Sequence, residues 1–400
     1  MDRLINPDTK PFFQRWFVYL LVMELIGAAL AHFGMLGRFD FRSFYAAGYL
    51  ARTQPAHLYD LTRQIWAQHA LVSPKGFLPF YHPAYEALIY APFSLLNYQY
   101  AYSSFLALNM LLLLAAFFVA RQVFSVPIEI WQPQPGSMFF IFLPLLIAAM
   151  QGQDSILLLL LCCLSWKELR TGNDVFAGAL LALALFKFQI AIPIAVLVAV
   201  RKGRRFSAGF LATASLLVLL CFGIAGPGGM TSLFHILTGA VSATDQNHSL
   251  LQNGMGIYPS TMPNIAGLFY ACGGRFLPGR LSFAVVAACS AGLFLWCARA
   301  VRAAEEDTAF SIAILCGLLV SYHAIIHDLT LVLLPIGLLA RQANRHIILA
   351  LFALPVVLLP FGSNAFFVLA VPVGAMLIGA ILSRTKLTST DPAPTTAIST

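Results

Sequence analysis

Long apolar runs separated by short charged segments dominate this sequence and restrict it to a membrane fold. Apolar residues make up 60% of the 400 residues and charged residues only 10%, against about half and a quarter in soluble domains. A helix crosses a bilayer with about 20 apolar residues. We therefore predict an all-α polytopic membrane protein with about 12 transmembrane helices. They are expected at residues 16–36, 100–120, 138–150, 155–166, 175–186, 190–200, 206–224, 282–300, 308–321, 329–340, 346–360 and 365–382.

Positive charge predicts how these segments are oriented. By the positive-inside rule, the Lys/Arg clusters face the cytoplasm; they lie at residues 3–15, 121, 167–170, 201–205, 299–302, 341–345 and 384–386. Consecutive clusters are separated by an even number of crossings only if residues 84–96 lie along the outer surface as an amphipathic helix. Residues 37–99 then form a first extracytoplasmic loop, folded and containing juxtamembrane helices.

The same topology predicts the domain organisation. Residues 1–383 form one integral membrane domain, within which 225–281 make a second external region. Residues 384–400 are polar and low in complexity, which is typical of a disordered tail. We expect both termini in the cytoplasm and the protein in a bacterial inner membrane.

Other features exclude several classes of protein. The net charge of +8 does not indicate a nucleic-acid partner, because the longest basic cluster, at 201–205, sits between apolar runs and reads as a topology signal. The seven cysteines show no metal-type spacing and are interpreted as packing residues. The apolar segment after Arg15 is too long for a cleaved signal and should remain as the first span.

Two pairs of helices are expected to be tight hairpins with polar tips. The intervals 138–166 and 175–200 must each go out and return within fewer than 30 residues, and their tips are 151–155 and 187–189. Polar groups left unsatisfied in hydrocarbon cost several kcal/mol each, so the tips should line a protein-enclosed cavity. The predicted topology gathers five polar groups on the extracytoplasmic side: 38–45, 151–155, 187–189, 244–253 and 322–328.

Asp40 is the first acidic residue after the first span, and Arg38 and Arg42 flank it. The two arginines would hold it ionised and could also bind an anionic ligand. An ionised carboxylate at the membrane surface suits a general base that activates a sugar hydroxyl. The alternative is a loop aspartate paired with arginine for structure, and the sequence leaves both interpretations open.

Lys187 stands in the middle of an apolar hairpin, where a cation is costly and therefore indicates function. The phosphate of a lipid carrier is a natural partner. The alternatives are an ion pair with Asp154 on the neighbouring hairpin and snorkelling of the side chain to the headgroups.

Two histidines, His323 and His327, precede Asp328 at a spacing that places both on one face if the segment is helical. No third ligand is fixed by the sequence, so we predict no metal site. Proton handling or hydrogen bonding to substrate is the favoured role, with capping of a helix end as the alternative. A further segment, 247–253, contains His248 and is rich in neutral hydrogen-bonding groups that suit polyhydroxylated ligands. The alternative is that it is an ordinary solvated loop.

Several short motifs occur in a fixed order along the chain. They are Asp40 to Gly48, Leu58-Tyr59-Asp60, Phe80 to Ala84, Ala91-Pro92-Phe93, Gly152-Gln153, Lys187-Phe188-Gln189, Asn247 to Leu250, and His327-Asp328-Leu329 with Pro335. Their order resembles that of glycosyltransferase family 87, the polyprenyl-phosphate-mannose-dependent α-mannosyltransferases of the GT-C superfamily. The resemblance spans about residues 38–340, and order and spacing carry it more than any single motif. Two positions depart from the family pattern: His82 follows Tyr81 where Tyr-Pro-Pro is common, and Phe188 follows Lys187 where Lys-Pro is common.

The resemblance implies a GT-C-like fold and a specific reaction. A sugar, mannose by family habit, would pass with inversion from a polyprenyl-phosphate donor to a hydroxyl of an extracytoplasmic glycolipid or glycan. Asp40 would be the general base and Lys187 a ligand of the donor phosphate. The lipid-linked sugar is a co-substrate. No other cofactor is expected, and the need for a divalent metal stays open. The remaining residues expected to bind substrate are Arg42, Tyr45, His82, Gln153, Gln189, His248, His323, His327 and Asp328.

Two other classes of function remain open. A transporter or flippase of a lipid-linked or polar solute also uses broken helices and midplane polar tips, but it would favour an internal repeat, and none is evident in the sequence. A non-catalytic membrane scaffold would need neither Lys187 in an apolar hairpin nor Asp40 between arginines.

Overall fold

A computed structural model describes residues 10–32, 39–124, 138–242, 259–340 and 342–387 of the chain. All regular structure in these residues is helical. Each of the twelve stretches expected to span the membrane is occupied largely by helix. In chain order the elements are α1 (Lys10–His32), α2 (Phe41–Thr53), η3 (Pro55–His57), α3 (Leu61–Leu71), α4 (Ala84–Tyr90), η4 (Phe93–Leu95), α5 (Tyr98–Val119), α6 (Arg121–Phe124), α7 (Met138–Ile141), α8 (Leu143–Gln151), α9 (Ser155–Arg170), α10 (Asp174–Leu183), η5 (Ala184–Lys187), α11 (Phe188–Lys202), α12 (Arg204–Ser242), η6 (Pro259–Thr261), α14 (Ile265–Ala271), η7 (Gly274–Phe276), α15 (Gly279–Val301), α16 (Glu306–Val320), η8 (Ile326–Val332), α17 (Leu333–Leu338), α18 (Arg345–Leu358), η9 (Leu359–Phe361), η10 (Ser363–Leu369) and α19 (Ala370–Leu387).

Several helices have the length and composition of membrane spans. Five helical runs in the described residues qualify, and six if the bent pair α8–α9 is taken as one span. The five runs are Tyr98–Val119, Asp174–Lys202, Arg204–Thr238, Gly279–Val301 and Ser363–Ser383. This is a membrane protein, although its helices of full span length are fewer than the twelve expected, because many apolar helices are too short to cross a bilayer alone.

Both tight hairpins are present. Helices α8 and α9 meet at 120° across a short break after Gln151. The run 174–202 also folds back on itself, because Lys202 Nζ at its end lies 3.5 Å from Asp174 Oδ1 at its start. A straight helix of that length would separate its ends by about 40 Å. The chain reverses at Lys187, whose backbone angles (φ −108°, ψ 57°) are not helical.

The ends of the two hairpins opposite their tips are tied together by charge. Lys202 Nζ also lies 2.8 Å from Glu306 Oε2, at the start of α16. The next residue, Asp307, accepts a 2.9 Å hydrogen bond from Trp166 Nε1 and pairs with Arg170 at 3.3 Å. Helices α9, α10 and α11 therefore share the beginning of α16 as an anchor. These contacts lie beside the positive clusters at 167–170 and 201–205, which the positive-inside rule predicts to face the cytoplasm.

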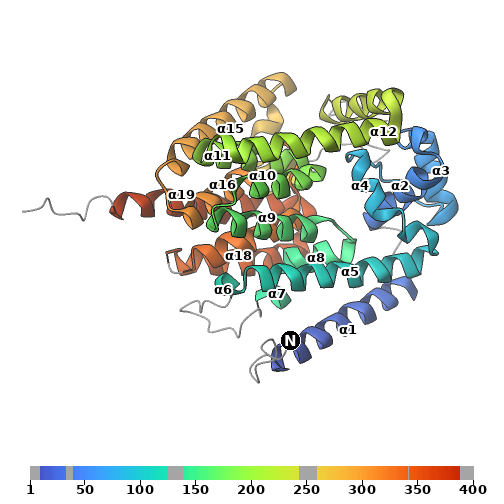
Figure 1. The fold of residues 1–400 in the computed structure, drawn as a ribbon, viewed down its shortest axis with the longest axis horizontal. Coiled ribbons are helices and arrows are strands. Elements are labelled where there is room, and N and C mark those ends of the chain that lie inside the picture. The colour runs from blue at the N-terminus through green and yellow to red at the C-terminus, as the bar shows by residue number, and fades with distance from the viewer. Residues whose placement is uncertain (1–9, 33–38, 125–137, 243–258, 341, 388–400) are drawn as a thin grey trace, which may run out of the picture.

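The segment between α1 and α5 is folded and helical, as expected for residues 37–99. Figure 1 shows α2, α3 and α4, in blue, at one end of the bundle, opposite the C-terminal end of α19, in red. Aromatic stacking fixes this cap: the Phe44 ring lies 4.7 Å from Tyr90 of α4, and the Phe41 ring lies 5.0 Å from Phe105 of α5. Such offset ring pairs add to the stability that burial gives.

Two helices extend beyond their expected ends. Helix α12 runs to Ser242, not 224, and is broken at Gly226 (φ 68°, ψ 171°), immediately before Pro227. Proline cannot continue a helix without losing a hydrogen bond, so the sequence explains the break. Helix α19 reaches Leu387, four residues into the segment expected to be a disordered tail. The rest of that tail, 388–400, lies outside the described residues.

Candidate functional site

A buried ion cluster joins the two hairpin tips to the segment after α16. Lys187 Nζ lies 2.6 Å from Asp328 Oδ1 and 2.9 Å from Asp154 Oδ1. All three side chains are almost fully buried, with 1–3% of their surface exposed. Charges buried to this extent are stable only when paired and hydrogen-bonded.

The fold places each member of the cluster at the end of a helix. Asp154 immediately precedes α9, Lys187 ends η5, and Asp328 lies in the first turn of η8. Further hydrogen bonds hold Asp328: its Oδ2 accepts from the backbone N of Ile325 at 2.9 Å, and its Oδ1 accepts from Ser155 Oγ at 3.1 Å. The ion pair with Asp154 that the sequence left open is therefore made, and Asp328 shares it.

Asp40 lies at the start of α2, next to the tip of the first hairpin. Gln153 Nε2 donates to Asp40 Oδ2 at 2.5 Å. The close approach depends on Gly152, which has a left-handed backbone (φ 64°) and in which an added Cβ would lie 2.7 Å from the Cβ of Phe41. Burial raises the pKa of Asp40 above its usual value, although the Gln153 hydrogen bond and the charge of Lys187 act in the opposite direction.

A second group of ionisable residues adjoins Asp154. His82 Nδ1 lies 2.7 Å from Glu86 Oε2 and 3.6 Å from Asp154 Oδ2. Burial raises the pKa of Glu86 to about 8. Burial alone would lower the pKa of His82, but the neighbouring carboxylates of Glu86 and Asp154 more than offset it, so the pKa is raised. Of these three interacting side chains, His82 is 17% exposed, whereas Glu86 and Asp154 are almost fully buried.

The two downstream histidines reach the same region separately. His323 Nε2 lies 3.4 Å from the hydroxyl of Tyr81, and His327 Nδ1 lies 3.2 Å from Gln151 Oε1. Residues 321–325 are not helical, so the expectation of a shared helix face does not hold. Burial lowers the pKa of His323 to about 4, which keeps this imidazole neutral at pH 7.

Other expected site residues have different surroundings. Arg42 turns away from Asp40 and donates to the backbone oxygens of Lys75 and Gly76 at 2.7 and 2.8 Å, holding the loop after α3. The hydroxyl of Tyr45 donates to the backbone oxygen of Leu96. Gln189 is partly buried and makes no polar contact among the described residues. His248 lies outside the described residues, as does Arg38.

Glu86 is a member of the site that sequence reasoning did not identify. It is fully buried in α4, and Tyr90 donates to its Oε1 at 3.4 Å. The available signal was an acidic residue in a short apolar helix, four positions after a histidine. The sequence indicates Asp154 as part of a hairpin tip and as a possible partner of Lys187, and the structure shows that it also lies 3.6 Å from His82.

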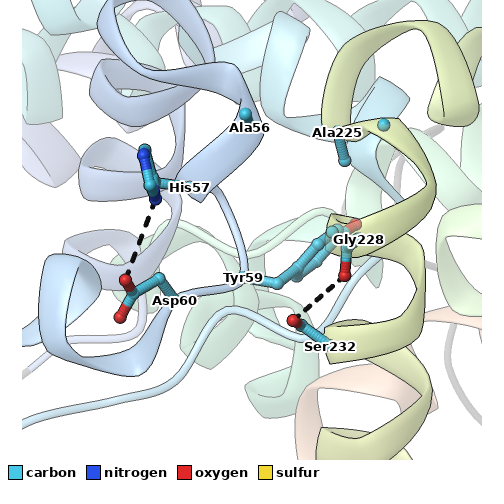
Figure 2. Close-up of a pocket in the computed structure, with 9 residues that line it drawn as sticks. Ala56, His57, Tyr59, Asp60, Ala225, Gly228 and Ser232 are labelled. Carbon is cyan, nitrogen blue, oxygen red and sulfur yellow. Dashed lines mark hydrogen bonds and ion pairs between the residues drawn. The ribbon is translucent and has the colours of Figure 1, made fainter.

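A separate cavity of about 510 Å³ lies between the segment 56–60 and the break in α12. Figure 2 shows His57 and Asp60 on one wall and Gly228 and Ser232 on the other, with Tyr59 reaching between them. The hydroxyl of Tyr59 donates to the backbone oxygen of His82 at 2.7 Å. The wall of this cavity is thus bonded directly to the chain segment that carries His82.

The arrangement can carry out acid–base chemistry on a polar substrate. It offers a partly exposed carboxylate at Asp40, a buried cation at Lys187 and a neutral imidazole at His323. Grouped ionisable residues with displaced pKa values are typical of catalytic sites.

Comparison with known proteins identifies one family. The sequence model described as "Glycosyltransferase family 87" matches residues 80–325, more than half of the chain. The matched segment includes His82, Gln153, Lys187 and His323, whereas Asp40 and Asp328 lie outside it and join the site through the fold. No curated protein and no solved structure matches the chain.

Proposed function

Because the chain belongs to glycosyltransferase family 87, we propose that it transfers a sugar from a polyprenyl-phosphate donor to a hydroxyl group of a glycolipid or glycan. Mannose is the proposed sugar, and the acceptor is on the extracytoplasmic side of a bacterial inner membrane. The observation that carries this proposal is the position of Asp40, a carboxylate held by Gln153 beside the buried ion cluster. A transferase of this kind needs one base, one cationic region and access from the membrane.

Asp40 acts as the general base of the proposed reaction. Gln153 engages only Oδ2, and among the described residues nothing donates to Oδ1. Oδ1 therefore remains able to take the proton of an acceptor hydroxyl as its oxygen attacks the anomeric carbon. The bond from that carbon to the phosphate oxygen breaks in the same step, and the carbon inverts. The raised pKa strengthens Asp40 as a base at pH values where it is ionised.

Lys187 supplies positive charge for the departing lipid phosphate. An ammonium group has three N–H donors. Asp328 accepts one of them, and Asp154 lies at ion-pair distance without an aligned hydrogen bond. A remaining donor is available to a phosphate oxygen. The two carboxylates also fix the direction of the ammonium group, which reduces the reorganisation needed when charge develops on the leaving group.

Neutral groups around the cluster suit a sugar. The Nδ1 atom of His323 is buried and has no hydrogen-bond partner within the described residues. His323 with Tyr81, and His327 with Gln151, form a border of hydrogen-bonding groups next to the cluster. Gln189 and His248 remain proposed contacts to substrate on the basis of the family motifs.

The test is a transfer assay with purified protein in detergent or proteoliposomes. Wild type, Asp40→Asn and Asp60→Asn are compared for transfer of radiolabel from polyprenyl-phosphate mannose to a membrane glycolipid extract. Asp60 is a matched control, because it is an aspartate at a helix start outside the cluster. Transfer by wild type and Asp60→Asn, with a folded but silent Asp40→Asn, supports the proposal.

Two other results would change it. Equal transfer by Asp40→Asn removes Asp40 as the base and moves the role to His327 or Asp328. No transfer by any protein, with donors carrying other sugars tested in turn, argues against the polyprenyl-phosphate donor and favours movement of a lipid-linked solute.

A further inference from the structure

Three potential metal-ligand atoms converge at the edge of the ion cluster. They are Nδ1 of His82, two residues before α4, Oε2 of Glu86, in the first turn of α4, and Oδ2 of Asp154, the residue before α9. Ligand atoms of these three residues lie within 4.8 Å of one another. Atoms bound to one cation at about 2.0–2.2 Å are separated by roughly 3 to 3.5 Å, so small side-chain movements suffice to bind one.

The other oxygen of each carboxylate is already held by a neighbour. Lys187 binds Asp154 through Oδ1, and Tyr90 donates to Oε1 of Glu86. This leaves Oδ2 and Oε2 directed toward His82. Outer contacts of this kind orient the first ligands of metal sites in proteins.

The converging atoms lack ordinary partners. By geometry, none of the three atoms makes an aligned hydrogen bond to the described residues. His82 Nδ1 and Glu86 Oε2 lie at ion-pair distance, 2.7 Å apart, and the Glu86 and Asp154 carboxyls are close enough to interact directly. Glu86 is fully buried and Asp154 is 2% exposed. Buried polar atoms without partners are costly and call for an explanation by an ion or another ligand.

We propose that His82, Glu86 and Asp154 bind a divalent transition-metal cation, of the Mn²⁺ or Zn²⁺ class. One imidazole and two carboxylates form a ligand set that suits these ions and leaves positions for other ligands. The sequence did not indicate this site, because Asp154 joins His82 and Glu86 only through the fold. Cation binding does not depend on the proposed transfer reaction. The role of the cation, which is to add positive charge near the leaving phosphate, rests on that reaction.

The experiment measures binding of the metal ion alone, without sugar substrates, to the full-length protein. Chelator-treated protein in detergent is titrated with Mn²⁺, and electron paramagnetic resonance follows the loss of free Mn²⁺. Wild type is expected to bind one Mn²⁺ per chain, which Zn²⁺ displaces. Glu86→Gln and Asp154→Asn should each weaken binding at least about tenfold, as expected when a ligand is lost. Asp60→Asn, which removes the carboxylate of the exposed His57–Asp60 pair, should bind Mn²⁺ as tightly as wild type.

A spectroscopic measurement on wild type avoids dependence on variants that fail to fold. Electron spin echo modulation of bound Mn²⁺ should show coupling to an imidazole nitrogen, and the coupling should disappear in His82→Asn. The proposal is overturned if folded wild type binds no Mn²⁺ or Zn²⁺. It is equally overturned if Glu86→Gln and Asp154→Asn bind as tightly as wild type. Neither result bears on sugar transfer, so the two proposals fail separately.

Discussion

The side-chain amide of Gln153 donates to one oxygen of Asp40, although 113 positions separate the two residues in the sequence. The bond links the tip of the first hairpin to the start of α2. It fixes which oxygen of Asp40 remains available for chemistry, and it stabilises the ionised form of the carboxylate. Gln153 is therefore a positioning residue for the proposed base.

Replacing Gln153 by leucine tests whether its amide positions the Asp40 carboxylate, because the pKa of Asp40 responds to that bond and not to a general loss of folding. Without the amide donor the pKa of Asp40 rises further, so the acid limb of the pH–rate profile should move to higher pH. We also expect kcat to fall by about tenfold to a hundredfold, because the carboxylate loses its orientation. The pH profile of kcat/KM measures the shift, with the exposed Gln122→Leu as control. An unchanged profile with reduced activity would assign Gln153 to substrate binding instead.

The pH dependence of wild type follows from the direction of the Asp40 shift. Burial raises the pKa of Asp40, so the carboxylate takes up a proton at a higher pH than an ordinary aspartate would. A base must be ionised, and activity should therefore fall as the pH drops through this raised pKa. His323, with a pKa of about 4, stays neutral over the range between that value and pH 7. Measured kcat/KM that stays constant down to about pH 4 would contradict the assignment.

Replacing Gly152, at the hairpin tip, by alanine should reduce activity more than the same replacement at another glycine with a left-handed backbone. Gly152→Ala adds a Cβ 2.7 Å from Phe41, whereas Gly172→Ala, also with a left-handed backbone (φ 80°), meets no atom within 4 Å. Both variants incur a backbone cost of about 1–2 kcal/mol. Only Gly152→Ala should displace Gln153 from Asp40 and reduce sugar transfer. Thermal unfolding and activity assays compare the two, and equal losses of activity would argue against the close approach.

Lys187 should be important for stability as well as for the reaction. Lys187→Met leaves Asp154 and Asp328 buried without their cation, which should cost about 3–5 kcal/mol. The exposed Lys167→Met serves as control. Adding Asp154→Asn and Asp328→Asn to Lys187→Met should recover part of the lost stability, since no uncompensated charge then remains. Thermal unfolding in detergent measures the stability of Lys187→Met, of Lys167→Met and of the triple variant. No difference between Lys187→Met and Lys167→Met would mean that the ion cluster is not a determinant of stability.

The sequence predicted the parts of the site that contrast with their surroundings. Lys187 and residues 151–155 are polar interruptions of apolar runs, and such interruptions must be enclosed by protein. The structure confirms that both are hairpin tips and brings them together. The predicted segments are largely helical, because hydrophobic runs are the strongest signal in a membrane sequence, but only five or six helical runs of the described residues have the length of a membrane span.

Contacts between distant segments could not be read in the same way. Arg42 is two positions from Asp40 in the sequence, but its guanidinium donates to Gln68 of α3 and to the backbone oxygens of the loop at 75–76. Glu86 looked like part of a surface helix, although α4 buries it completely. His323 and His327 have helical spacing, but the backbone at 321–325 is not helical and η8 begins only at Ile326. In each case tertiary packing determined the outcome, and one sequence contains no direct record of it.

The anchoring of α9, α10 and α11 at Glu306 and Asp307 has a mechanical consequence. Those helices carry Asp154 and Lys187 at their far ends, and α16 leads from the same anchor to the segment with Asp328. These helices are thus held together at both ends, by the contacts of Glu306 and Asp307 at one end and by the ion cluster at the other. A change in helix spacing at Glu306 and Asp307 would be transmitted along the stiff helices to the ion cluster. The alignment of the ion cluster is therefore set in part by ion pairs on the opposite side of the molecule.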